Sequence, residues 1–191
     1  MTLQTFSVNE TPPASKMNSL SRQAVIVCTL ATRPSSPDEG MHVYCTDVNL
    51  AYWWDGSAWK SIPRGIVTKT TLTATGPGIG GTFATVNNSP LTTTMIANEY
   101  YAYEVDLTIM TTVAGDIFNI KPQLDGSDID AQRIVYIPVA GVAFPVSLRV
   151  IQSVGTTANH TFSLVVGRSS GTGTGSAPAG TDCTLSHVGG P

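Results

Sequence analysis

The chain has 191 residues, which is enough for one hydrophobic core together with a small additional module. Charged residues make up 12% of it, about half the usual share for a soluble domain, and the net charge of -3 gives no positive field that would hold nucleic acid. No stretch approaches the apolar length needed to cross a bilayer, so we expect neither a nucleic-acid-binding nor a membrane-spanning protein.

Residues 1–32 are predicted to form an N-terminal arm with a short helix and a strand. The apolar spacing within 14–23 is that of about two helical turns, and the continuous apolar run at 24–30 has the length of a strand that is buried or pairs at an edge. The apolar side chains of this arm that we expect at an attachment interface are Met17, Leu20, Val25 and Val27. The arm either packs on its own domain or docks into a partner or a symmetry-related copy. The polar leader does not have the apolar core of a signal peptide, so we expect synthesis in the cytoplasm.

Residues 33–62 contain all three tryptophans and the densest group of aromatic residues. Turn residues separate three short β-prone runs, and Asp55-Gly56 is the strongest hairpin signal in the chain. These features predict a small β-meander that leans on a neighbour, since three strands are close to the lower limit for independent stability. The aromatic residues that we expect at the attachment interface are Tyr52, Trp53, Trp54 and Trp59. Side chains alternate along a strand, so Trp53 and Trp54 are expected on opposite faces, one in the core and one against a neighbour.

The three cysteines, Cys28, Cys45 and Cys183, are far apart in sequence and form no CxxC pair. Their number is odd, and a chain made in a reducing cytoplasm keeps its thiols unpaired while it folds. We therefore expect buried free thiols, with a disulfide or a metal site as the alternative.

Residues 66–191 are predicted to form an antiparallel, jelly-roll-like β-sandwich, with residues 63–65 as the linker before it. From 101 to 109, apolar residues at odd positions alternate with polar ones, as on a strand with one face in the core. Similar alternation recurs towards the end of the chain without a helical period. The Gly/Ser/Thr-rich tract at 169–180 is expected to be a flexible loop. The fold class is therefore all-β, with a small arm and meander ahead of a sandwich.

Few residues form a pattern that points to chemistry. Gly76–Gly81 matches GxGxxG, but the β-prone residues after it do not supply the helix that a nucleotide site needs, so no cofactor is expected. Three carboxylates close to a turn, at Asp125, Asp128 and Asp130, are the best candidates for a cation site, with solvated turn acids as the simpler reading. The sequence has no nucleophile elbow or zinc-protease motif, and lone histidines are mostly surface or packing residues. We expect a protein that is not an enzyme.

The meander carries residues that resemble a known family. After a Pro-rich approach come Glu39-Gly40, a tyrosine-containing strand, Thr46-Asp47 and then Trp54-Asp55-Gly56-Ser57-Ala58-Trp59. This arrangement resembles a module common in structural proteins of tailed bacteriophages, among them short fibres, minor tail proteins and head-decorating proteins. Asn18-Ser19-Leu20 and the terminal Val188-Gly189-Gly190-Pro191 are similar to the same group. The family often has an acidic residue where this chain has His187.

The resemblance implies a virion structural protein, made in the host cytoplasm and attached to the particle through its N-terminal part. It implies a homotrimer, and as partner a major capsid protein or a tail protein. Within the class, a head-decorating protein or short head fibre is preferred because the chain is too short for a long fibre shaft. The alternatives are a minor tail or tail-tip protein, and a lectin-like module that recognises glycan on the host surface with its Tyr52, Trp53 and Trp54 rings.

Overall fold

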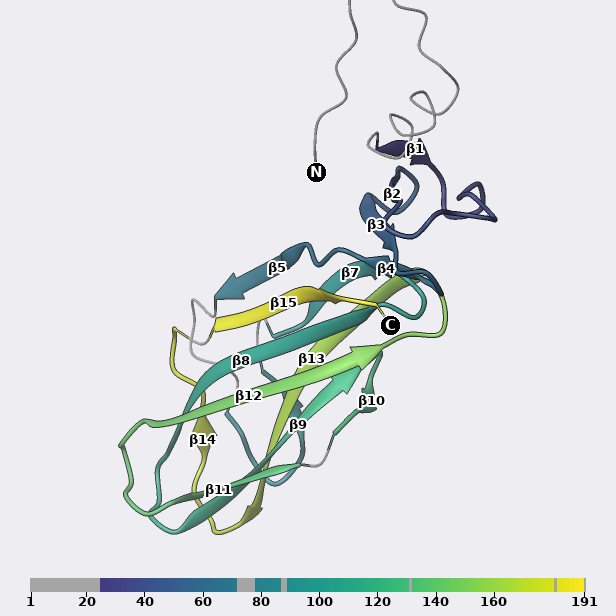
Figure 1. Cartoon of the computed structure of the whole chain (residues 1–191). Helices are drawn as coiled ribbons and strands as arrows, with labels where there is room; N and C mark the ends of the chain where they lie inside the picture. The colour runs from purple at the N-terminus through teal and green to yellow at the C-terminus, as the bar shows by residue number, and fades with distance from the viewer. Residues whose placement is uncertain (1–24, 72–77, 87–88, 131, 181, 191) are drawn as a thin grey trace, which may run out of the picture. The chain divides into compact units, whose positions relative to one another are not determined.

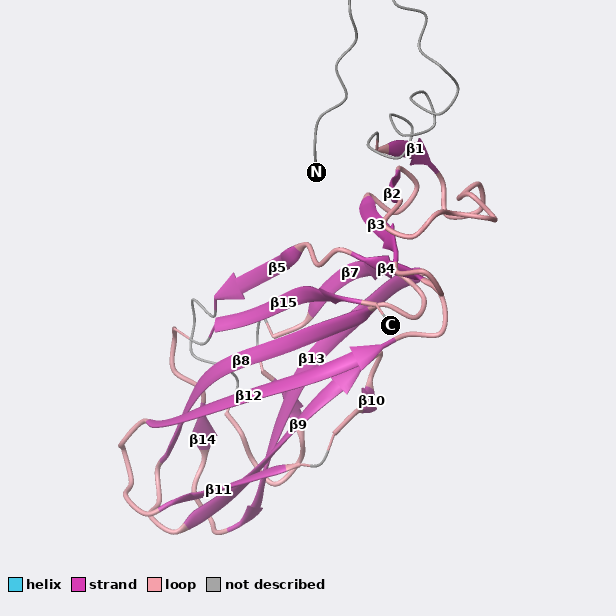
Figure 2. Cartoon of the chain, in the orientation of Figure 1, coloured by secondary structure: helices cyan, strands magenta, loops and turns pink. Residues whose placement is uncertain are grey.

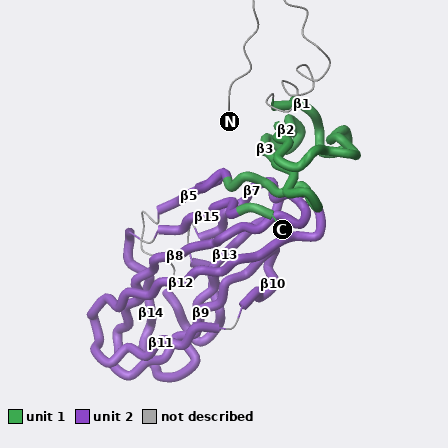
Figure 3. The backbone as a smooth tube through the Cα atoms, viewed as in Figure 1, with its two compact units in different colours: residues 1–63, 189–191 green, residues 64–188 purple. Residues whose placement is uncertain are grey.

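In the computed structural model of the chain, the regular elements of the described residues are β-strands (Figure 2). The residues that it describes are 25–71, 78–86, 89–130, 132–180 and 182–190. The all-β fold class expected from the sequence is confirmed. No helix within these ranges has the length and apolarity needed to span a membrane. The chain divides into two compact units, coloured separately in Figure 3: unit 1 consists of residues 1–63 and 189–191, and unit 2 of residues 64–188.

Unit 1 is built on a four-stranded sheet in the order β1-β2-β3-β4, labelled in Figure 1. Its strands are β1 (Ile26–Cys28), β2 (His42–Cys45), β3 (Leu50–Trp54) and β4 (Trp59–Ser61). The last three pair antiparallel as a meander, whereas β1 pairs in parallel with β2. The apolar run expected to be a strand thus lies at the edge of this sheet.

The turn between β3 and β4 is fixed by the Asp55-Gly56 hairpin signal. The Asp55 carboxylate accepts hydrogen bonds from the backbone N–H groups of Ala58 (2.7 Å) and Ser57 (2.8 Å). These bonds lower the pKa of Asp55 to about 2. Gly56 supplies the left-handed backbone of the turn, with φ at +96°. The turn sets Trp54 opposite Trp59, and the two rings meet edge to face with centroids 5.5 Å apart.

One face of this sheet is buried, in part beneath Arg33 of the same unit. The side chains packed there include Val43, Cys45, Leu50 and Tyr52, all at most 2% exposed. The Arg33 guanidinium lies over the Tyr52 ring, 4.9 Å from its centroid, and 5.8 Å from the centroid of a Trp59 ring. A cation over an aromatic face is attracted by the ring quadrupole, so Arg33 closes this small core with its charge as well as its stem.

Unit 2 is an antiparallel β-sandwich of two sheets (Figure 1). One sheet has the order β10-β9-β13-β6, with β11 also paired to β9 and β7 to β13; the other has the order β12-β8-β15-β5, with β14 paired to β8. The long strands are β8 (Tyr100–Thr111), β9 (Asp116–Leu124), β12 (Phe144–Ser153), β13 (Ala158–Ser170) and β15 (Asp182–Gly189). The shorter strands are β5 (Gly65–Thr71), β6 (Ala84–Thr85), β7 (Leu91–Met95), β10 (Ser127–Asp128), β11 (Arg133–Ile137) and β14 (Gly175–Ser176). The predicted sandwich is confirmed.

Alternation along the strands builds the core of unit 2. The inward side chains of β8 are Tyr101, Tyr103, Val105, Leu107 and Ile109, and they face Phe118, Ile120, Phe162, Leu164 and Val166 of the other sheet. The Tyr103 ring stacks on Phe162 with centroids 5.2 Å apart, and its hydroxyl donates to the Ser89 carbonyl at 2.9 Å. Complete burial of one such side chain stabilises the fold by roughly 1.5–3 kcal/mol, so this layer carries most of the stability of unit 2.

The glycine-rich tract at 169–180 is folded against the sandwich, so the expected flexible loop is wrong. Its Gly175–Ser176 segment pairs with β8 as β14. The Asp116 carboxylate, which is fully buried, accepts hydrogen bonds from the backbone N–H groups of Thr172 (3.0 Å) and Gly173 (3.3 Å). The Thr111 hydroxyl donates to the same carboxylate and is the main reason that its pKa is lowered. A buried carboxylate with satisfied oxygens therefore replaces the side-chain packing that glycines cannot provide.

Candidate attachment surface

The sheet of unit 1 has a second face that the described residues of the unit leave open. Directly paired residues on neighbouring strands point to the same side of a sheet. The pairing sets Val27 beside Tyr44 and Tyr44 beside Ala51. It likewise sets Trp53 between His42 and Lys60. Val25 lies two residues before Val27 and so continues the same side. We call this surface the open face: Val25, Val27, His42, Tyr44, Ala51, Trp53 and Lys60.

The open face is apolar along one edge and aromatic at its centre. Val25 is 59% exposed, Val27 69% and Trp53 38%. His42 and Lys60 flank Trp53 with polar groups. An apolar centre with a polar rim is the usual composition of a protein–protein interface, in which rigid aromatic rings serve as anchors.

The expected attachment residues divide between the two faces of this sheet. Val25, Val27 and Trp53 lie on the open face, whereas Tyr52, Trp54 and Trp59 belong to the covered face. The prediction that the two adjacent tryptophans point in opposite directions agrees with the burial pattern of β3. Met17 and Leu20 lie outside the described residues. Sequence reasoning missed His42, Tyr44, Ala51 and Lys60, whose place follows only from the strand register.

The three acidic residues considered for a cation site are not brought together. Asp125 pairs with His160 at 2.6 Å, Asp128 with Lys121 at 2.7 Å, and Asp130 with Arg133 at 3.1 Å. Hydrogen bonds from His160 and Lys121 lower the pKa values of Asp125 and Asp128. Among the described residues no three His, Cys, Asp or Glu side chains form a group that could hold a metal ion. These carboxylates are turn acids with protein partners.

The two histidines of unit 2 are held by hydrogen bonds. The His160 side chain contacts the Asp125 carboxylate through Nδ1, which raises the pKa of the histidine, and its Nε2 donates to the Thr156 carbonyl at 3.2 Å. His187 is fully buried and accepts a hydrogen bond from the Arg64 backbone N–H at Nδ1. Its Nε2 therefore carries the proton and donates to Glu99 at 3.2 Å. Both rings have the packing and pairing roles expected for lone histidines.

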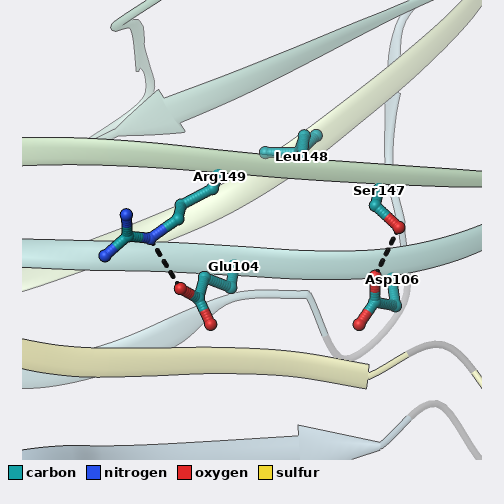
Figure 4. Close-up of a pocket in the computed structure, with 5 residues that line it drawn as sticks. All are labelled: Glu104, Asp106, Ser147, Leu148 and Arg149. Atoms are coloured by element: carbon teal, nitrogen blue, oxygen red, sulfur yellow. Dashed lines mark hydrogen bonds and ion pairs between the residues drawn. The ribbon is translucent and has the colours of Figure 1, made fainter.

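A second candidate surface is a shallow hollow of about 270 Å³ on the outer side of β8 and β12, drawn in Figure 4. The Arg149 Nε donates to Glu104 at 2.6 Å, and the Ser147 hydroxyl donates to Asp106 at 2.6 Å. These polar groups satisfy one another across the strand pair. The sequence signal for this surface is the polar half of the alternation along β8, at Glu104 and Asp106. The hollow is polar and open, and its polar side chains are already paired with one another.

Comparison with known proteins gives weak likenesses. No family model matches the chain, and no curated protein matches it. Solved structures similar to it include the VP2 subviral particle of infectious bursal disease virus (TM-score 0.45, 14% identity, covering 81% of this chain and 40% of that one). The Gt strain of the same virus gives a TM-score of 0.42 at 16% identity, with coverages of 82% and 42%. The EclA C-terminal domain, a sugar-binding protein, gives a TM-score of 0.30 at 17% identity, with coverages of 61% and 66%.

The viral chains are thus matched over less than half of their own length. These likenesses are too low to assign an activity or a partner. The chain's own residues define its class: an antiparallel β-sandwich combined with a small aromatic sheet that has one open apolar face.

Proposed function

We propose that this chain is a non-enzymatic structural component of a tailed-phage virion and that it attaches to the particle through the open face of unit 1. The observation that carries the proposal is the exposure of Val25, Val27 and Trp53 on one side of a four-stranded sheet. The tryptophan-containing turn behind this face is also the segment that resembles virion proteins. Unit 1 therefore contains both the segment that resembles virion proteins and an exposed apolar surface that a partner could cover.

The open face is suited to association in two ways. Burying an exposed valine or aromatic side chain contributes roughly 1.5–3 kcal/mol, so a few such residues are enough for a specific contact. β1 also lies at the edge of its sheet, and an edge strand can extend its pairing into another chain. Association in this form needs no cofactor or catalytic group.

Within the virion we place the chain on the head, as a decoration protein or short head fibre that forms a homotrimer and binds the major capsid protein. A tail protein is the alternative partner. The proposal rests on the resemblance of the meander and on the low share of charged residues, 12%, because a weakly charged surface favours packing between copies. The solution mass tests the trimer: three times 20.0 kDa supports it, and a monomer at micromolar concentration contradicts it.

The attachment assignment is tested by co-sedimentation with particles that lack this chain. Val27→Asp places a charge on the open face, and we expect it to weaken binding by roughly tenfold or more. Ile134→Asp is the matched control, because Ile134 is 66% exposed and Val27 69%, but Ile134 belongs to the sandwich. The assignment fails if Val27→Asp binds as well as the unaltered chain, or if Ile134→Asp loses binding to the same degree.

A lectin-like role is a second candidate, favoured by the partly exposed Trp53 ring between His42 and Lys60. An exposed indole with polar neighbours can stack on a sugar ring while they hydrogen-bond to its hydroxyl groups. Trp53→Ala should then abolish a change in thermal stability caused by host glycan. Trp54 is not the residue to change, since its ring packs on Trp59. A chain that ignores glycan but binds particles supports the structural role alone.

A further inference from the structure

Cys28 and Cys45 lie side by side in unit 1. The parallel pairing of β1 with β2 sets Cys28 opposite Cys45, and their Sγ atoms are 3.6 Å apart. Neighbouring strands are about 4.7–4.9 Å apart, within the Cα separation of about 4.4–6.8 Å that a disulfide spans. To form a bond of about 2.05 Å, the sulfur atoms need to approach by about 1.5 Å, which side-chain rotation and small backbone adjustments can supply.

We propose that Cys28 and Cys45 form a disulfide once the folded protein leaves the reducing cytoplasm, and that this bond ties β1 to the meander. β1 has three residues, and β2 is its strand neighbour in the sheet of unit 1. β1 also carries the exposed Val27. A covalent tie across β1 and β2 closes the loop between residues 28 and 45, which limits the conformations open to the chain when this strand separates. The proposal concerns redox chemistry and holds whatever particle or ligand the open face binds.

A small-molecule disulfide such as glutathione disulfide is the oxidant. The thiolate of Cys28, the more accessible of the pair, attacks one sulfur of the oxidant. This forms a mixed disulfide and releases one glutathione, which takes up the Cys28 proton. Cys45 then gives up its proton and attacks the Cys28 sulfur, which displaces the second glutathione as a thiol. Two protein thiols are oxidised, and one glutathione disulfide is reduced to two thiols.

The surroundings of Cys45 make its attack the slow step. Burial, the largest cause, raises the pKa of Cys45, and it still acts after Cys28 has formed the mixed disulfide. Because the thiolate is the reacting form, little of it is present at neutral pH. We therefore expect the pair to close gradually under sustained oxidising conditions.

Cys183 explains the odd number of cysteines. It lies in the core of unit 2, 2% exposed, where burial raises its pKa. A thiol of this kind is inert. The sequence thus holds one pair that can close and one thiol that stays free, so the alternative of a disulfide applies to Cys28 and Cys45 only.

The test is intact-mass analysis of the full chain after equilibration with glutathione disulfide at mildly alkaline pH. The native protein is freed of oxidant, unfolded without reductant, and alkylated. We expect a mass lower by two hydrogen atoms than that of the reduced chain before alkylation, and one alkylated thiol instead of three after it. Peptide mapping should join Cys28 to Cys45. Cys183→Ser should retain the bond, whereas Cys28→Ser should lose it. Three alkylatable thiols, a glutathione that stays on Cys28, or a bond to Cys183 or between molecules would overturn the assignment.

The tie to the meander has its own readout. All three tryptophans lie at positions 53, 54 and 59 in unit 1, so tryptophan fluorescence reports the unfolding of that unit. We expect the oxidised chain to unfold at a higher urea concentration than the same chain after reduction, with Cys28→Ser unfolding at one midpoint under both conditions. Equal midpoints for oxidised and reduced unaltered chain would show that the bond does not stabilise β1.

Discussion

The two units of this chain bury apolar surface in different ways. Unit 2 packs two sheets face to face, so the inward side chains of β8 in one sheet and those of β13 in the other are buried between the sheets. Unit 1 has a single sheet, in which Arg33 and the aromatic rings close one face and the other stays open. A sandwich completes its own core, whereas a single sheet has apolar surface left for a partner. This difference is why we assign attachment to unit 1.

The largest effect is expected in the sandwich core. Phe118 is fully buried on β9, and a Cβ built on Gly175 would collide with its ring, so the glycine-rich tract packs directly against it. Phe118→Ala should lower the free energy of unfolding by about 3–5 kcal/mol, because it removes buried surface and leaves a cavity. Urea denaturation followed by far-UV circular dichroism measures the loss. Ile134→Ala, at an exposed position, should change stability by no more than about 0.5 kcal/mol. A similar small loss for Phe118→Ala would contradict the two-layer core.

A substitution at Gly171 tests the attachment of the glycine-rich tract to Asp116. Gly171 has φ at +97°, and an added Cβ would overlap the Asp116 carboxylate. Gly171→Ala should destabilise unit 2 by about 1–3 kcal/mol from backbone strain alone, with the collision adding to it. Gly180→Ala is the control: its φ is +101°, but its Cβ would meet no atom within 4 Å. Equal losses in the two variants would mean that the tract does not depend on Asp116.

The same carboxylate gives the sandwich a dependence on acid. The hydrogen bond from Thr111 lowers the pKa of Asp116 below its ordinary value of 3.8, and the backbone N–H groups of Gly173 and Thr172 act in the same direction. The stabilisation is therefore complete above about pH 4 and is lost as the pH falls through the lower, folded-state pKa. Thermal unfolding between neutral and strongly acidic pH should show this loss, and Asp116→Asn should make it shallower. If the thermal stability of the variant fell with pH in the same way as that of the unaltered chain, Asp116 would not be the source of the acid dependence.

The smallest effect is expected in unit 1, at the cation over the rings. Arg33→Lys keeps the charge but loses the planar group that lies over Tyr52 and near Trp59. The free energy of unfolding of unit 1, measured by tryptophan fluorescence, should fall by about 0.5–1 kcal/mol. Lys60→Arg, on the open face, is the matched exchange and should leave the midpoint unchanged. If both exchanges have the same effect, Arg33 has no special part in closing the covered face.

Features that depend on neighbouring residues could be predicted from the sequence. The alternation from 101 to 109 identified the inward face of β8, and Asp55-Gly56 identified the turn between β3 and β4. The opposite orientation of Trp53 and Trp54 followed from strand geometry. Alternation does not say which side of a strand the rest of the chain will cover. That side is set by the course of the loop that carries Arg33, and so three of the expected attachment residues lie on the covered face.

Features that depend on distant residues had no signal in the sequence. The parallel pairing of β1 with β2 brings Cys28 to Cys45, although the intervening chain gives no local indication of it. The contact of Asp116 with residues 172–173 joins segments more than fifty residues apart, and a run of glycines without that contact resembles a free loop. In both cases the deciding interaction is tertiary.

The central claim, that the chain attaches through the open face of unit 1, is tested most directly by photo-cross-linking on particles. A photoreactive phenylalanine replaces Trp53 in one variant and Tyr136 in another, since Tyr136 is a similarly large side chain, 59% exposed, in unit 2. Each variant is bound to particles that lack the chain, irradiated and analysed by mass spectrometry. We predict cross-links to a particle protein from position 53 and none from position 136. Cross-links to the particle from position 136 alone would contradict the claim and assign attachment to the sandwich.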